Sequence, residues 1–181
     1  GTVTMNPKDS ATPPHAFENL GYGVLRQKYG IRYINVFERP FKKVDLGEGV
    51  HLGFNPDILE SDFVVDLPVL KTHAGTGMTG ALKHTYGILS MADGSSGVRH
   101  YSESGSQCGK MWGLVRAPDL NIVDCIWVSH ESLSGYPAST TYRSNTLLAG
   151  IDPVALDYYG GKHILYPLGG PYQDRHDPDT Y

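Results

Sequence analysis

The order in which strand-like and helix-like segments follow one another is the feature that most constrains the fold of this chain. Apolar runs typical of buried strands occur at residues 62–67, 119–128 and 145–149, and helix-forming patterns lie between them or follow them. Parallel strands need long crossover connections, which helices usually supply. The sequence therefore predicts an α/β layered fold with a mostly parallel or mixed sheet flanked by helices.

Turn and cap signals give the remaining elements. Gly30 ends an amphipathic pattern, Gly47 and Gly49 bound two short strand patterns, and the pair Asn55-Pro56 is typical of a helix start. We expect a helix at residues 12–30, a strand at 31–37, a hairpin formed by 41–46 and 50–54, and a short helix through Leu59. We further expect helices at 81–87 and 107–115, loops at 71–80, 93–105 and 129–143, and a helix opened by Asp152-Pro153.

Composition and charge exclude several classes of protein. A chain of 181 residues with 40% hydrophobic residues can form one domain, and no apolar run approaches the length that crosses a bilayer. With 15 Lys and Arg against 19 Asp and Glu, the chain lacks the basic excess typical of nucleic-acid binding. We expect a single α/β domain over residues 1–181 with no membrane span and no nucleic-acid partner. Because the chain starts at Gly1 without an initiator Met and ends abruptly, we expect it to lack terminal segments of the full protein.

The chain has only two cysteines, Cys108 and Cys125. They allow one disulfide at most and cannot form a four-cysteine zinc or iron–sulfur site within the chain. Cys125 falls inside a strand pattern, which favours a core position. Separated thiols are typical of a reducing compartment, so the cytoplasm is favoured while the location stays open.

The segment from Lys71 to Gly80 carries the main chemical signal. Its glycines permit close backbone approach, and they lead into a predicted helix whose unpaired N–H groups attract an anion. Ammonium and hydroxyl groups surround these glycines, so a phosphate or a carboxylate fits. The predicted anion-binding residues are Lys71, Thr72, Thr76, Gly77, Thr79, Gly80, Lys83 and, from the next loop, Arg99.

Two other interpretations of this segment are a P-loop and a tight turn without a ligand. The spacing of Gly75 and Gly80 matches a phosphate-binding P-loop, but Ala81-Leu82 stands where that motif needs Lys and Ser or Thr. We therefore reject a P-loop. A tight strand-to-helix turn without any ligand explains the same glycines and stays open.

Histidines near this segment suggest acid–base chemistry. His73 follows the predicted strand, where an imidazole that titrates near neutrality can move a proton, and His100 is the second candidate catalytic residue. A histidine that is hydrogen-bonded for structural reasons is the alternative. A metal site formed by His73, His84 and His100 is a third reading, although the chain has no His-x₃-His or His-Glu-x-x-His spacing.

The carboxyl ends of strands give the expected position of the site. In α/β sheets ligands bind beyond these ends, so the loops after residues 67, 128 and 149 are expected to face one cleft. Asp152 is expected to cap the last helix, whereas Asp157 points either toward the sheet end or toward solvent. Tyrosines at residues 136–142 suggest an aromatic wall or a protein-docking face.

Several motifs occur together in a familiar order. They are Asp62 to His73, Thr79 to Gly87, Arg99-His100, Leu120 to Asp124, and Asp152 to Asp157. Over residues 61–159 the chain resembles the family known as domain of unknown function 362, whose pattern is a strand, Pro-Lys-x-Lys-Thr-His, then Thr-x-x-x-Lys-Asn-x-x-Gly. His84 replaces the usual Asn, Val69 replaces the first Lys, and the family's earlier N-terminal strand is absent.

This resemblance implies a partner more readily than a reaction. Members of the family are often joined to ferredoxin-like modules and described as iron–sulfur proteins. Because this chain cannot hold such a cluster, the resemblance implies a separate ferredoxin-type partner. The order His73, Gly77, Gly80, Lys83 is also similar to the catalytic domain of the nickel-pincer lactate racemases, which implies a histidine that takes a proton from carbon beside a carboxylate.

The function expected from the sequence is the binding of a small anionic metabolite at the glycine-rich segment, with acid–base chemistry by His73 and His100. The alternative is a non-catalytic module that binds a ligand or docks onto an iron–sulfur electron carrier. The cofactor, the substrate and whether the chain is an enzyme are left open.

Overall fold

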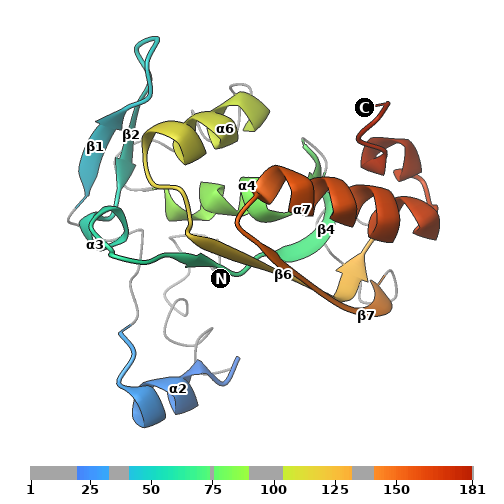
Figure 1. Cartoon of the computed structure of the whole chain (residues 1–181), viewed down its shortest axis with the longest axis horizontal. Coiled ribbons are helices and arrows are strands. Elements are labelled where there is room, and N and C mark those ends of the chain that lie inside the picture. The colour runs from blue at the N-terminus through green and yellow to red at the C-terminus, as the bar shows by residue number, and fades with distance from the viewer. Residues whose placement is uncertain (1–19, 33–40, 74–75, 90–103, 132–140, 181) are drawn as a thin grey trace, which may run out of the picture.

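The structure of the chain is a computed structural model, which describes residues 20–32, 41–73, 76–89, 104–131 and 141–180. Within these residues the chain forms a main sheet and a separate two-stranded hairpin. Figure 1 shows helices α4 (Ala81–His84) and α7 (Pro153–Tyr159) on the same side of the main sheet. This side is called the covered face below, and the opposite side is called the open face.

The main sheet combines parallel and antiparallel pairs. Within the described residues its strands are β3 (Val65–Asp66), β4 (Val69–His73), β5 (Gly77–Thr79), β6 (Leu120–Ser129) and β7 (Thr141–Gly150). Strands β3 and β4 both run parallel to β6, whereas β5 pairs with β4 and β7 pairs with β6 in antiparallel orientation. The predicted α/β fold, with a largely parallel or mixed sheet flanked by helices, is confirmed.

Short helical segments follow one another on the covered face. Helix α4 continues into the 3₁₀ turn η1 (Thr85–Ile88), and α7 continues into the π-helical segment η3 (Gly160–Leu165). Further segments are α2 (Tyr22–Tyr29), α3 (Pro56–Leu59), α6 (Ser104–Leu114), η4 (Tyr166–Leu168) and η5 (Gln173–His176). No helix among the described residues is long and apolar enough to cross a membrane.

The separate hairpin has its own core. Strands β1 (Lys42–Asp45) and β2 (His51–Phe54) pair across a turn in which Gly47, Glu48 and Gly49 have positive φ, as the glycine spacing predicts. Its buried cluster joins the hairpin to α6 and η1 and consists of Leu46, Leu52, Phe54, Tyr86, Leu89 and Met111. The predicted cap of α3 is also confirmed, because the Asn55 side chain accepts a hydrogen bond from the Asp57 N–H group.

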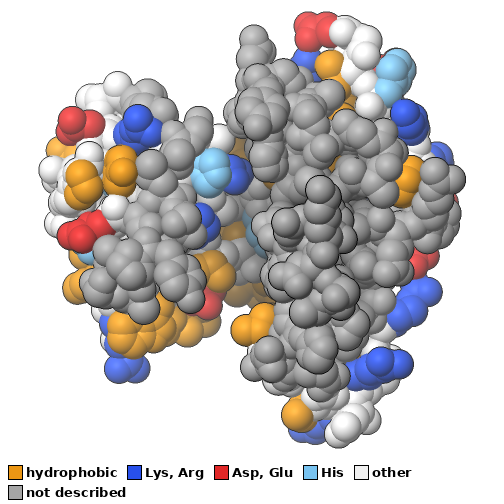
Figure 2. Space-filling view, turned by 180° about the vertical axis from the view of Figure 1, so that it is seen from behind, with side chains coloured by type: hydrophobic (Ala, Val, Ile, Leu, Met, Phe, Trp, Pro, Cys, Tyr) orange, Lys and Arg blue, Asp and Glu red, His pale blue; other side chains and the backbone are white. Residues whose placement is uncertain are grey.

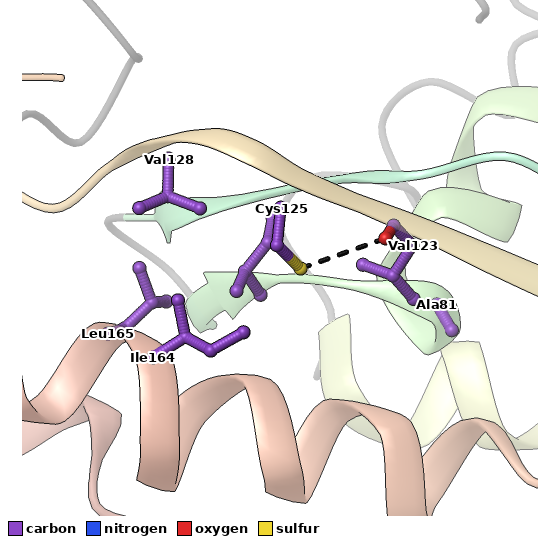
Figure 3. Packing of buried hydrophobic residues seen from close by; sticks show 7 residues of the cluster. Ala81, Val123, Cys125, Val128, Ile164 and Leu165 are labelled. Atoms are coloured by element: carbon purple, nitrogen blue, oxygen red, sulfur yellow. Dashed lines mark hydrogen bonds between the residues drawn. The ribbon is translucent and has the colours of Figure 1, made fainter. Parts of the chain in front are cut away.

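The main core lies between the sheet and the helices of the covered face. Figure 3 shows side chains of β6 pointing toward the helical segment that carries Ile164 and Leu165. The cluster consists of Leu70, Ala81, Val123, Cys125, Val128, Ile164 and Leu165. Leu70, Val123 and Cys125 alternate with exposed or half-buried residues, so the helices of the covered face bury one side of these stretches of β4 and β6.

Three sequence predictions about the sheet are wrong. Residues 71–80 were expected to form a loop, but β4 and β5 form a hairpin there, since Lys71 to His73 pair with Gly77 to Thr79. The strand at 62–67 is shorter and is not buried on both sides, because Phe63, Val65 and Leu67 are exposed. Strand β7 runs antiparallel to β6, so the loop after residue 149 lies at the opposite end of the sheet from the loop after residue 128.

Other boundaries differ less. Of the predicted helix at 12–30 the structure has α2, and the earlier residues lie outside the described part. Residues 31 and 32 are not in a strand, and the rest of the predicted strand at 31–37 lies outside the described part. Helix α6 begins at Ser104, three residues before its predicted start.

Candidate functional site

The alternation of β4 separates its side chains between the two faces of the sheet. Leu70 and Thr72 are completely buried on the covered face, and Leu70 belongs to the main core. Lys71 and His73 are half-buried and therefore lie on the open face. This separation divides the predicted anion-binding residues into two groups.

Lys71 lies in the middle of a polar row on the open face. Its Cα partner on β5 is Thr79, and its Cα partner on β6 is Ser129. Directly paired residues of neighbouring strands project to the same face of a sheet. The row therefore consists of a hydroxyl, an ammonium group and a second hydroxyl on three adjacent strands, and it is called the Thr79–Lys71–Ser129 row below.

The ammonium group of Lys71 is only weakly compensated. Its Nζ donates one long hydrogen bond of 3.4 Å to the carbonyl oxygen of Thr72, and no ion pair forms with it among the described residues. Burial lowers the pKa of Lys71 below its ordinary value. A negatively charged group beside Nζ would offset this desolvation.

Both hydroxyls of the row are buried without a partner. Thr79 is 9% exposed and Ser129 is 6% exposed. Neither Thr79 Oγ1 nor Ser129 Oγ has a hydrogen-bond partner in the part of the chain that the structure describes. Since buried hydroxyls are normally hydrogen-bonded, two such groups beside one lysine indicate a missing polar partner.

His73 lies on the same face as Lys71, at the carboxyl end of β4. Its Cα partner is Gly77, whose φ of 69° is readily adopted only by glycine. Two residues along a strand are separated by about 7 Å, so the imidazole and the ammonium group can contact one small molecule. A joint role of His73 and Lys71 stays a prediction.

Other predicted residues have local or structural contacts. Thr72 faces the covered side, where its hydroxyl donates to the carbonyl oxygen of Ser129 at 3.2 Å. Thr76 donates to the carbonyl oxygen of Met78 at 2.8 Å within the β4–β5 turn. Lys83 is half-buried on α4. Arg99 and His100 lie outside the described residues.

A carboxylate of the chain itself holds the start of α4. Asp157 on α7 accepts hydrogen bonds from the N–H groups of Ala81 at 2.5 Å and Leu82 at 3.0 Å. Burial raises the pKa of Asp157 to about 6, against the opposing effect of these two hydrogen bonds. A Cβ on Gly80 would lie 2.1 Å from Asp157 Oδ1, so only glycine fits there. Glycine at this position thus serves the contact with Asp157.

His84 is engaged on the covered face. Its Nδ1 lies 2.5 Å from Oδ1 of the buried Asp66. His73 lies on the open face, so the described residues do not bring these two histidines together. In the described part of the chain no group of three or more His, Cys, Asp or Glu is placed to hold a metal ion.

Two further predictions can be compared with the structure. Asp152 caps α7 by accepting from the N–H groups of Val154 and Ala155, as expected. Cys125 is buried in the main core as predicted, and burial raises the pKa of its thiol to about 12. The tyrosine-rich stretch at 136–142 lies mostly outside the described residues.

Ser129 is the site residue that sequence reasoning missed. It was assigned to a polar loop, although it directly follows the apolar run of β6. A serine at the carboxyl end of a buried strand is a signal that could have identified it. In Figure 2 a histidine and Lys or Arg side chains are visible near the middle of this view of the molecule.

The fold and this row define an α/β protein with a polar, incompletely paired sheet face. The family model described as domain of unknown function (DUF362) matches residues 2–162. The chain therefore belongs to the DUF362 family, as the ordered motifs indicated. This match does not support the second resemblance, to the lactate racemases, which stays a prediction.

One curated relative is the thylakoid-associated protein sll1697 of Synechocystis sp. It is 29% identical over 147 residues, which are 78% of this chain and 44% of that protein. The chain thus spans less than half the length of this relative. No solved structure matches the chain.

Proposed function

We propose that this chain binds a small anionic metabolite on the open face of its sheet, at the Thr79–Lys71–Ser129 row. The observation that carries this proposal is the coincidence of three groups. A half-buried ammonium group without an ion pair in the described residues lies in register with two buried hydroxyls that lack hydrogen-bond partners. A carboxylate or phosphate would supply acceptors for all three groups at once.

The proposed chemistry uses His73 as a general acid or base. The imidazole lies on the same face as Lys71 and one strand repeat away from it, which suits proton transfer at an atom beside the bound anion. Lys71 would then stabilise the negative charge that develops on the substrate.

The proposal is tested by titrating the purified chain with inorganic phosphate and, separately, with acetate. Calorimetry measures the affinity for each anion. The Lys71→Met variant keeps the apolar stem and removes the charge. We expect it to bind at least tenfold more weakly, because one charge-assisted hydrogen bond is lost. Lys43→Met is the matched control, since Lys43 is exposed on β1 away from the main sheet.

Two outcomes would refute anion binding at this row. One is equal affinity of wild type and Lys71→Met, and the other is no binding of either anion at millimolar concentration. A role of His73 is tested separately, since His73→Ala should keep anion affinity within about threefold while abolishing turnover of any substrate.

No specific observation favours the alternative function, docking onto an iron–sulfur electron carrier. The tyrosines on which it depended lie mostly outside the described residues, and a ferredoxin-type partner stays an expectation of the family resemblance.

A further inference from the structure

The surroundings of the Thr79–Lys71–Ser129 row indicate what the rest of its ligand is like. Trp127 precedes Ser129 by two residues on β6, and Val128 between them is buried in the main core. The indole ring therefore lies on the open face with the row, and Trp127 is 54% exposed. A large exposed aromatic side chain next to an incompletely paired polar group is a typical element of a ligand site.

A second apolar side chain on the open face belongs to β4. Val69 precedes Lys71 by two residues on β4, projects to the open face and is 49% exposed. Because β4 and β6 are parallel, Val69 and Trp127 both lie on the amino-terminal side of the row. The register between β4 and β6 shifts here, so Val69 has Asp124 as its Cα partner, and Trp127 lies between Asp124 and Ser129 along β6. Both side chains therefore offer apolar surface on the amino-terminal side of the row.

Charged side chains on the open face restrict the positions at which a bound ligand can carry a negative group. The guanidinium group of Arg143 lies over the ring of Trp127, 5.6 Å from its centroid, and holds the indole in place. Asp124, the Cα partner of Val69, lies beside Val69 on β6, and its carboxylate accepts a hydrogen bond from the N–H group of Ile126 at 2.8 Å. A second negative group of a ligand would be repelled there.

We infer that the ligand of this site carries one anionic group, which binds the Thr79–Lys71–Ser129 row, and a flat apolar body, which packs on Trp127 and Val69. The inference rests on the proposed function and adds the chemical class of the ligand, a carboxylate that carries an aryl group or an aryl phosphate. Carboxylate and phosphate share the acceptor geometry that the row requires, and the experiment distinguishes them.

The test compares pairs of probes that differ by one ring. Phenyl phosphate is titrated against inorganic phosphate, and phenylacetate against acetate, with the whole chain in a calorimeter. We expect the aromatic member of at least one pair to bind about tenfold more tightly, because the ring buries apolar surface against Trp127. The pair with the larger gain identifies the anionic group.

Variants then assign the gain to the indole. Trp127→Ala should remove the tenfold gain and leave the affinity for inorganic phosphate or acetate unchanged, whereas Trp127→Phe should keep most of the gain. Leu147→Ala is the matched control, because Leu147 is exposed on the open face beyond Asp124. Thermal melting of each variant confirms that the fold is intact.

The outcomes separate this inference from the proposed function. If phosphate or acetate binds through Lys71 but the ring adds no affinity, or if Trp127→Ala weakens both members of a pair equally, the aromatic class is overturned and anion binding stands. If no probe binds, or if Lys71→Met binds every probe as wild type does, both proposals are overturned.

Discussion

Neighbouring residues of β4 have different surroundings on the two faces of the main sheet. On the covered face Leu70 packs in the main core and Thr72 donates to a carbonyl oxygen of the next strand. On the open face Lys71, between them, has a single long hydrogen bond. The covered face is closed by interactions within the chain, whereas the ammonium group on the open face is only weakly compensated by the described residues.

Missing partners alone do not distinguish the faces. Asp66 Oδ2 and Asn121 Oδ1 on the covered face also lack hydrogen-bond partners in the described residues. Asn121 is completely buried and Asp66 is only 8% exposed. The two sets differ in their neighbours, because Asp66 is paired with His84 whereas Thr79 and Ser129 are in register with Lys71, whose ammonium group has no ion pair in the described residues.

The largest expected effect comes from truncation on the covered face. Leu70→Ala should lower the free energy of unfolding by about 2–5 kcal/mol, because it leaves a cavity in the main core. Val69→Ala removes the next side chain, which is half exposed on the open face, and should cost less than about 1 kcal/mol. Urea unfolding of both variants measures the contrast.

Equal losses of unfolding free energy in Leu70→Ala and Val69→Ala would contradict the contrast between the two faces. Such a result would mean that another part of the protein covers the open face as tightly as helices cover the other one.

The titration of two buried groups, Asp157 and His176, should change the free energy of unfolding by a smaller amount. Burial raises the pKa of Asp157 from 3.8 to about 6. As the pH rises from 4 to 6, the carboxyl group therefore loses its proton in the unfolded chain before it does so in the folded chain. Asp157 therefore makes the free energy of unfolding fall as the pH rises through this window. His176 acts in the opposite direction, since burial and the nearby His130 lower its pKa from 6.5 to about 4. The unfolded chain then gains this proton first, and stability falls as the pH drops from 6.5 toward 4.

Variants separate the two contributions. Relative to wild type, Asp157→Asn should make stability rise more steeply with pH between 4 and 6, and His176→Phe should make it rise less steeply or fall. Each difference is limited to about 1.4 kcal/mol per pH unit, the value for one proton. Urea midpoints at half-unit pH intervals measure the slopes, and slope changes of the same sign would contradict the assignment.

Local signals in the sequence predicted much of the fold. The turn between β1 and β2 and the caps Asn55 and Asp152 depend on neighbouring residues, so their spacing was sufficient. The β4–β5 hairpin was missed because glycine and threonine between two strands look like a loop, whereas cross-strand hydrogen bonds fix the pairing. The direction of β7 depends on pairing with β6, which no local pattern specifies.

The same distinction applies to the site. Residue type selected Lys71, His73 and Thr79, which share the open face. Thr72 was grouped with them, but it projects to the covered face, which only a strand assignment reveals. The contact between Asp157 and α4 spans 76 residues of sequence and was therefore beyond local reasoning.

The smallest expected effect compares two buried threonines on opposite faces. Thr72→Val removes a hydroxyl that donates to Ser129, so the carbonyl oxygen loses a donor and stability should fall by about 1 kcal/mol. Thr79→Val removes a buried hydroxyl without a partner in the described residues, and should leave stability unchanged within about 0.5 kcal/mol. Affinity for inorganic phosphate or acetate should fall severalfold in Thr79→Val and stay constant in Thr72→Val. If Thr79→Val destabilises the chain as Thr72→Val does and keeps full affinity, the hydroxyl of Thr79 has an internal structural role, and the row loses one of the groups assigned to the ligand.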